Sequence, residues 1–130
     1  MKIEKISAFF AIVMGIFIIG TWIIFYVTDS IPELKIEPVR IGMHLLAEAL
    51  TGLGLIMGGY GLVENKKWGH NIHLVSMGML LYTLIISPGY YAEKRNYLIV
   101  GIFSFFFLVN ILLIILTIFT KKNLITNSKD

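Results

Sequence analysis

The chain has 130 residues, of which 57% are hydrophobic and 15% are charged, and it contains no cysteine. A globular chain carries about 25% charged residues, and the mean hydropathy of this one is +0.82. The absence of cysteine excludes disulfides, thiolate nucleophiles and cysteine metal sites. The net charge of +3 is modest. Its lysines flank the apolar segments, where an anionic leaflet explains them without nucleic acid. We therefore expect a single membrane domain, residues 1–130, and no nucleic-acid partner.

The first apolar segment, residues 6–28, carries no charged residue. A helix of this length reaches roughly 34 Å, which is enough to cross a hydrocarbon core of about 30 Å. The segment is longer than the apolar region of a signal peptide, about 7–15 residues, so we expect a membrane helix. Trp22 and Tyr26 lie near its end, where aromatic rings anchor a helix at the membrane interface.

The rest of the chain alternates apolar segments with polar turns. The mixed charges and two prolines of residues 29–40 predict a polar loop on the membrane surface. Proline cannot continue a helical hydrogen-bond ladder, so we expect the third helix to stop before Pro88. We expect the later membrane helices at residues 41–63, 68–87 and 97–120. A polar C-terminal tail follows at residues 121–130. The pattern predicts an all-α polytopic membrane protein, with four transmembrane helices in a four-helix bundle of two helical hairpins.

Basic residues near the helix ends predict the orientation, because cytoplasmic loops are rich in lysine and arginine. Four basic residues belong to the two loops on one side: Lys35, Arg40, Lys94 and Arg95. Seven belong to the side of both termini: Lys2, Lys5, Lys66, Lys67, Lys121, Lys122 and Lys129. We therefore expect a multi-pass protein of the cell membrane with cytoplasmic N- and C-termini. A bias of this size leaves a dual topology open.

Glu48 is the strongest candidate for a functional residue. It belongs to the second predicted membrane helix, about 12 Å below the outer surface of the membrane. A carboxylate at membrane depth is a functional candidate by default. His44 shares its helix face at the i−4 position. Tyr82 and Thr83 are expected at the same depth on the next helix. We predict that these four residues line an outward-facing polar pocket for a small molecule or a proton. A buried hydrogen-bonded group that holds the helices together is the alternative.

Other polar residues are weaker candidates for the same pocket. Thr51 continues the helix face of Glu48, and Ser87 lies one turn further out than Thr83. Arg95 could cover the pocket from the third loop, while Asn110 would lie somewhat deeper on the last helix. Such groups can equally satisfy one another in the bundle interior, since buried polar atoms need partners.

The remaining histidines, His70 and His73, share a helix face at i and i+3. The antiparallel register of the second and third helices places His73 about 15 Å from the level of Glu48, so one metal site that contains all of them is not expected. Two ligands do not complete a usual closed metal site. We therefore predict no metal site, interpret both histidines as interfacial, and keep them as weak metal-ligand candidates.

Glycines crowd the second predicted membrane helix, and Gly54 and Gly58 form a GxxxG motif. Small residues let membrane helices approach closely, where van der Waals contact drives association. Tight packing within one chain is the favoured interpretation, and homodimerisation is the alternative.

The motif H-x-x-x-E-x-x-x-G-x-G-x-x-x-G-G, from His44 to Gly59, precedes a W-G pair and an S-P-G-Y run. Together they resemble small prokaryotic four-helix membrane proteins of no assigned function. A weaker resemblance, at Glu48, Gly52 and Gly58, is to the DoxX-like group, and it implies a respiratory or redox-associated membrane subunit. Neither resemblance supplies catalytic residues.

The sequence thus leads to a membrane protein that binds a small molecule or a proton, with the lipid bilayer as its certain surroundings. A redox-associated subunit and a structural or assembly partner in a membrane complex are the alternatives. Nothing in the sequence identifies a cofactor, and no residue pattern indicates an enzyme.

Overall fold

The computed structural model describes residues 2–127, with side chains described as far as Lys122. These residues form only helices, which are α1 (Lys2–Val27), α2 (Glu33–Ile36), α3 (Pro38–Val63), α4 (Gly69–Glu93) and α5 (Tyr97–Asn127). Four of them, α1, α3, α4 and α5, are long and apolar enough to cross a membrane. The predicted all-α fold with four membrane helices is confirmed.

The three turns between long helices begin in the same way. Asp29, Asn65 and Arg95 follow the ends of α1, α3 and α4, and their φ angles are 51°, 53° and 56°. A left-handed residue at this position lets the next backbone N–H return to a carbonyl of the last helical turn. The three resulting bonds join Ser30 to Phe25, Lys66 to Gly61, and Asn96 to Tyr91, over 2.9, 2.8 and 2.9 Å.

Two predicted helix ends are corrected by the structure. Helix α4 continues through Pro88 to Glu93 instead of ending at residue 87. Proline removes one backbone hydrogen bond, but membrane helices tolerate this loss where neighbouring groups satisfy the freed backbone. Helix α5 continues past residue 120 to Asn127, so residues 121–127 of the predicted tail are helical. Residues 128–130 lie outside the described part of the chain.

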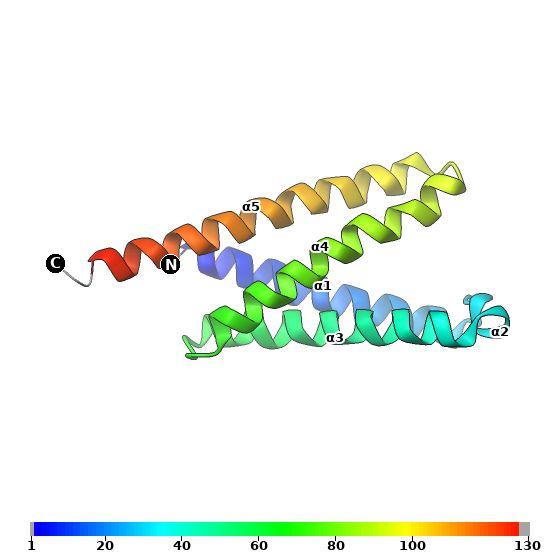
Figure 1. Ribbon diagram of the computed structural model, residues 1–130, viewed down its shortest axis with the longest axis horizontal. Coiled ribbons are helices and arrows are strands. Elements are labelled where there is room, and N and C mark those ends of the chain that lie inside the picture. The colour runs from blue at the N-terminus through cyan, green and yellow to red at the C-terminus, as the bar shows by residue number, and fades with distance from the viewer. Residues whose placement is uncertain (1, 128–130) are drawn as a thin grey trace.

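The helices form two hairpins that separate toward one end of the molecule (Figure 1). Helix α1 packs mainly on α3, and α4 packs on both α3 and α5, whereas α1 meets α5 less extensively. Near the turn that joins them, α3 and α4 lie together, and the described start of α1 and end of α5 are at this end (Figure 1). At the opposite end, which carries α2, the α4–α5 hairpin diverges from the α1–α3 hairpin (Figure 1). The expected arrangement as two helical hairpins is confirmed.

Glycines allow the close contact of α3 with α4. A Cβ atom on Gly58 would lie 2.6 Å from the backbone nitrogen of His73, and one on Gly69 would lie 2.2 Å from the carbonyl carbon of Gly61. Only glycine fits at such a backbone separation. Gly54 also faces α4, since a Cβ there would lie 2.5 Å from Ser76 Oγ. Both glycines of the GxxxG motif therefore pack within the chain, as the favoured interpretation predicts.

An apolar core fills the middle of the bundle. Its buried residues come from all four long helices and include Met14, Ile18, Leu55, Met77, Leu80 and Leu113. Dispersion contacts among such side chains stabilise a membrane bundle, because lipid is as apolar as they are. This core lies between the polar groups at the two ends of the bundle.

Candidate functional site

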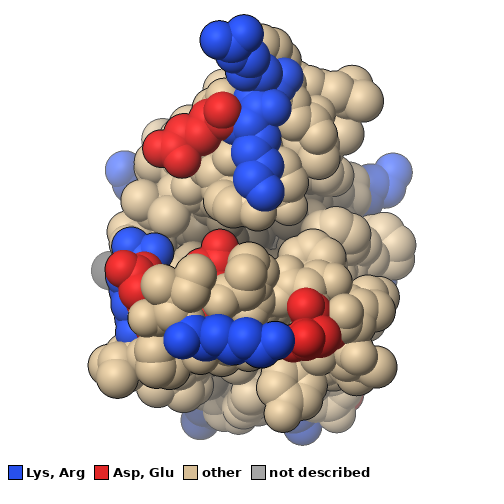
Figure 2. All heavy atoms as spheres, turned by 90° about the vertical axis from the view of Figure 1, so that its right-hand side faces the viewer, with Lys and Arg blue, Asp and Glu red and all other residues tan. Residues whose placement is uncertain are grey.

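A pocket of about 430 Å³ lies between the two hairpins at the end where they diverge. Figure 2 shows this end of the molecule hollowed between two lobes, with acidic and basic side chains around the hollow. The volume falls in the range of small-molecule sites, about 300–1,000 Å³. The polar and charged residues that line it are Thr21, Ser30, Glu33, Arg40, His44, Glu48, Thr83 and Ser87, together with the polar tips of Trp22, Tyr90 and Tyr91.

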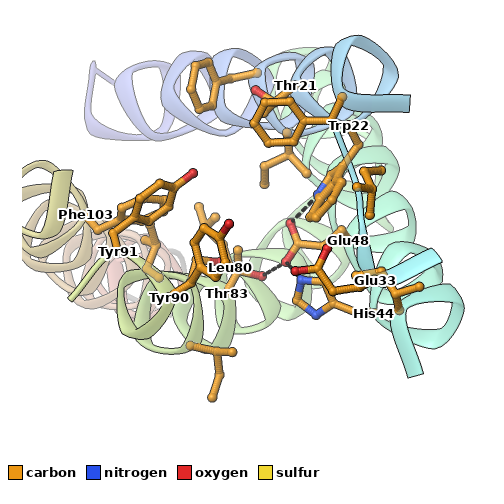
Figure 3. A pocket seen from close by; sticks show the side chains of 18 of the residues that line it. Thr21, Trp22, Glu33, His44, Glu48, Leu80, Thr83, Tyr90, Tyr91 and Phe103 are labelled. Carbon is orange, nitrogen blue, oxygen red and sulfur yellow. Dashed lines mark hydrogen bonds and ion pairs between the residues drawn. The ribbon is translucent and has the colours of Figure 1, made fainter. Parts of the chain in front are cut away.

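Glu48 lies roughly 15 Å along α3 from its start at Pro38, and its carboxylate is held from two other helices. Thr83 of α4 donates its hydroxyl to Oε1 over 3.0 Å, and Trp22 of α1 donates Nε1–H to Oε2 over 3.4 Å (Figure 3). The residue is only 5% exposed, yet it lines the pocket. A buried polar group with partners and an open face is suited to meet a bound molecule.

The i−4 spacing brings His44 beside Glu48, as predicted. Its Nε2 atom lies 4.0 Å from Glu48 Oε1, which makes an ion pair when the imidazole is protonated. The indole ring of Trp22 packs edge-on against the rings of His44 and Phe25, with centroids 5.6 and 5.9 Å apart. These edge-to-face contacts hold the indole ring of Trp22 in place, and its N–H points at the Glu48 carboxylate.

Charged groups surround the mouth of the pocket. Arg40 lines it, and its guanidinium lies 2.5 Å from a carboxylate oxygen of Glu37. Lys94, in the α4–α5 turn, donates a hydrogen bond to the hydroxyl of Tyr90, and its ammonium lies 4.2 Å from the centroid of the same ring. This hydrogen bond raises the pKa of Lys94 above its ordinary value, and the nearby Glu33 carboxylate adds to the effect. The mouth therefore already holds one ammonium group on an aromatic ring.

Four predicted residues meet at this pocket: His44, Glu48, Thr83 and Ser87. Tyr82 does not join them, which corrects the prediction that placed it beside Glu48. It is 63% exposed and is absent from the pocket lining. Successive helical residues point about 100° apart. At the depth shared by Tyr82 and Thr83, only Thr83 therefore faces inward.

The other weak candidates lie elsewhere. Thr51 is buried, and its hydroxyl bonds the Ala47 carbonyl of its own helix over 2.8 Å. Asn110 is also fully buried, and its side-chain amide donates to the Met77 carbonyl over 3.0 Å. Arg95 lies in the turn with its side chain exposed. None of these three lines the pocket, and the guanidinium in its lining belongs to Arg40.

His73 faces the interior of the bundle. It is fully buried, and its Nε2 atom lies 2.7 Å from Ser7 Oγ of α1. The close contact at Gly58 draws this part of α4 into the bundle, so a histidine near the helix end is covered. His70 is half-buried. Among the described side chains, no three histidine, aspartate or glutamate residues gather closely enough to hold a metal ion.

Sequence reasoning missed several pocket residues, above all Trp22. It was interpreted as an interface anchor because only its depth was considered. The antiparallel register of α1 and α3, which brings Gly15 against Gly52, also places Trp22 near the level of Glu48. Glu33, Tyr90 and Tyr91 were assigned to loops. Their positions depend on the short helix α2 and on the continuation of α4 beyond Pro88.

The fold and the pocket define a multi-pass α-helical membrane protein with a buried carboxylate between two hairpins. All 130 residues match one family, described as Domain of unknown function (DUF8058), and the chain belongs to that family. No curated protein and no solved structure matches the chain. The resemblance to an uncharacterised family is thus supported, while the comparisons give no support to the DoxX-like resemblance.

Proposed function

We propose that the chain binds a small molecule in the pocket between its hairpins, with Glu48 as the polar group that meets it. One observation carries this proposal: a glutamate that is 5% exposed lines a pocket of about 430 Å³. A group that served only to hold helices together would need no space beside it. Intramembrane carboxylates are costly, and they mark substrate or ion sites by default.

The surroundings of Glu48 support binding at a fixed position. A carboxylate offers about four lone-pair sites, and Thr83 and Trp22 take one on each oxygen. The remaining capacity is available to an occupant. The other walls of the pocket are mostly apolar and aromatic, with Phe17, Ile18 and Phe103 among them. An occupant with an apolar body and one polar or charged group fits this division.

The proposed orientation has both termini in the cytoplasm of a cell, with the pocket open to the outer side of its membrane. The excess of lysines at the end that carries the termini and residues 64–67 supports it. The described ends of α1 and α5 and the α3–α4 turn lie at one end of the bundle (Figure 1). The pocket lies at the other end, toward the side with fewer basic residues.

A structural role of Glu48 is the competing candidate, because its carboxylate connects α1, α3 and α4. In that case the chain serves as a helical partner in a membrane complex or a homodimer. The two roles differ in whether solutes reach Glu48. A structural link requires a closed interior, whereas a binding site requires access from one side of the membrane.

Thiol accessibility tests the proposed function, and the chain contains no cysteine of its own. Ser87 is half-buried in the pocket wall, whereas Ser76 is buried against Gly54 in the α3–α4 contact. We expect a membrane-impermeant thiol reagent, added outside, to modify the Ser87→Cys variant and to leave the Ser76→Cys variant unmodified. A folded Ser87→Cys variant that reacts from neither side would contradict an open pocket and favour the structural role.

A further inference from the structure

We propose that the occupant of the pocket is a lipophilic organic cation, such as a quaternary ammonium or phosphonium ion or a protonated amine on an apolar body. The inference rests on the proposed function and names the class of molecule that the same site would take. It follows from the charges that line the pocket, from its aromatic walls and from the position of Lys94.

The charges of the pocket leave an excess of carboxylate. Glu33 and Glu48 line it, and Arg40 is the one lysine or arginine among its lining residues. That guanidinium is already paired with a third carboxylate, Glu37, at 2.5 Å. Three carboxylates, those of Glu33, Glu37 and Glu48, thus stand against two basic side chains, Arg40 and Lys94, in the pocket and at its mouth. Such an excess between low-dielectric walls concentrates cations and repels anions.

Aromatic rings surround the same space. Trp22, Phe25, Tyr90, Tyr91 and Phe103 line the pocket. The face of an aromatic ring attracts a cation within about 6 Å, most strongly for tryptophan and where water is excluded. In Figure 3 the rings of Trp22, Tyr90 and Tyr91 are arranged around the pocket that contains Glu48. A carboxylate among several rings is the combination that recognises ammonium and phosphonium ions.

Lys94 supplies an independent observation, because the chain places a cation of its own at the mouth. Its ammonium lies over the Tyr90 ring at 4.2 Å from the centroid. The negative charge of Glu33 helps to raise the pKa of this ammonium, after the hydrogen bond to Tyr90. A primary ammonium therefore already lies against one of the rings that we assign to recognition. An incoming cation would meet Tyr90 and Glu33 first, in competition with Lys94, and Glu48 at greater depth.

Occupants of other charge fit less well. An anionic amphiphile would bring its charge close to Glu33 and Glu48, where repulsion is costly because little water screens it. An uncharged occupant of the same shape would make the apolar contacts, but it would not neutralise the negative charge of the carboxylates. The charge of the occupant is therefore the property that the site should distinguish.

Matched probes separate these cases. Tetraphenylphosphonium and tetraphenylborate carry the same four phenyl groups and opposite charges, and triphenylphosphine oxide is an uncharged relative. Binding is measured on the full-length chain in mild detergent by equilibrium dialysis. The fluorescence of Trp22 reports on the pocket in a Trp68→Phe background, since the chain has two tryptophans. We expect the phosphonium to bind at least about tenfold more tightly than the borate.

Four variants locate the effect. We expect Glu48→Gln to weaken phosphonium binding by about tenfold or more and Glu33→Gln to weaken it several-fold. Glu64→Gln is the matched control, because Glu64 is exposed in the turn at the opposite end, and it should change nothing. Lys94→Gln should strengthen binding by removing the competing ammonium. If Glu48→Gln does not fold, the Glu33→Gln and Lys94→Gln variants still test the inference.

The outcomes distinguish the inference from the function on which it rests. If none of the three probes binds or changes Trp22 fluorescence, both are overturned. If the borate or the oxide binds as tightly as the phosphonium and quenches Trp22, the pocket stands and the preference for cations is overturned. Phosphonium binding that is unchanged by the Glu33, Glu48 and Lys94 substitutions also overturns the inference.

Discussion

The hydroxyl of Thr83 donates a 3.0 Å hydrogen bond to Oε1 of Glu48, and this bond joins α4 to α3 at the pocket. Toward the termini α3 and α4 are in close contact, and toward α2 the hairpins diverge (Figure 1). The bond therefore lies near the place where the two hairpins separate. Glu48 thus combines two properties, a contribution to stability and a surface in the pocket.

The first prediction concerns this bond. Thr83→Val removes the donor and leaves a buried carboxylate oxygen without that partner, so we expect the free energy of unfolding to fall by about 1 kcal/mol. Thr51→Val is the matched control, because the Thr51 hydroxyl bonds a carbonyl of its own helix. Unfolding in mild detergent, followed by circular dichroism, measures both. Equal stability losses in the two variants would show that the interhelical bond contributes nothing specific.

The second prediction concerns the α3–α4 contact. A Cβ on Gly58 would lie 2.6 Å from backbone atoms of His73. Gly58→Ala should therefore separate the helices and destabilise the fold by about 1–3 kcal/mol. Gly78→Ala is the control, since nothing lies within 4 Å of a Cβ at that position. A Gly58→Ala chain that melts at the wild-type temperature would be incompatible with the close approach described.

The third prediction concerns Ser7 and His73. Ser7→Ala removes the partner at 2.7 Å from His73 Nε2 and leaves a fully buried imidazole without it. We expect a loss of about 1–3 kcal/mol. Ser104→Ala is the control, because Ser104 is exposed and bonds a carbonyl of its own helix. Thermal unfolding of the two variants should differ clearly, and indistinguishable curves would mean that this buried pair does not stabilise the bundle.

The fourth prediction concerns orientation. In sealed right-side-out vesicles, a Lys35→Cys variant should react with a membrane-impermeant thiol reagent. A Lys66→Cys variant should react only after the membrane is permeabilised, because residues 64–67 lie on the predicted cytoplasmic side. Both lysines are exposed in polar segments, so folding should be unaffected. The reverse pattern would invert the topology, and partial labelling of both variants would indicate a dual topology.

Hydropathy was enough to predict the four membrane helices, because each apolar segment can only satisfy its backbone in lipid as a helix. It could not predict that α4 continues past Pro88, because the outcome depends on what surrounds the freed carbonyl. That continuation places Tyr90 and Tyr91 on the pocket wall. The short helix α2, which brings Glu33 to the mouth, gave no periodic signal over its four residues.

The candidate site was predicted as far as helix spacing and depth allow. The i−4 spacing identified His44 with Glu48, and depth identified Thr83. Depth could not choose between Thr83 and Tyr82, because their directions depend on how α4 is rotated about its axis. Trp22 and Ser7 were missed for a related reason. Contacts between distant segments depend on the register of helix pairs, which in this chain is set by backbone contact at Gly15 and Gly58.

The most direct test of the account is whether a bound molecule perturbs Glu48 itself. Difference infrared spectroscopy of the purified chain, with and without tetraphenylphosphonium, records the carboxyl and carboxylate bands that change on binding. The account predicts a difference band in the wild-type chain that disappears in Glu48→Gln and persists in Glu64→Gln. A band that persists in a folded Glu48→Gln variant, or no band in the wild-type chain, would contradict the assignment of Glu48 as the binding group.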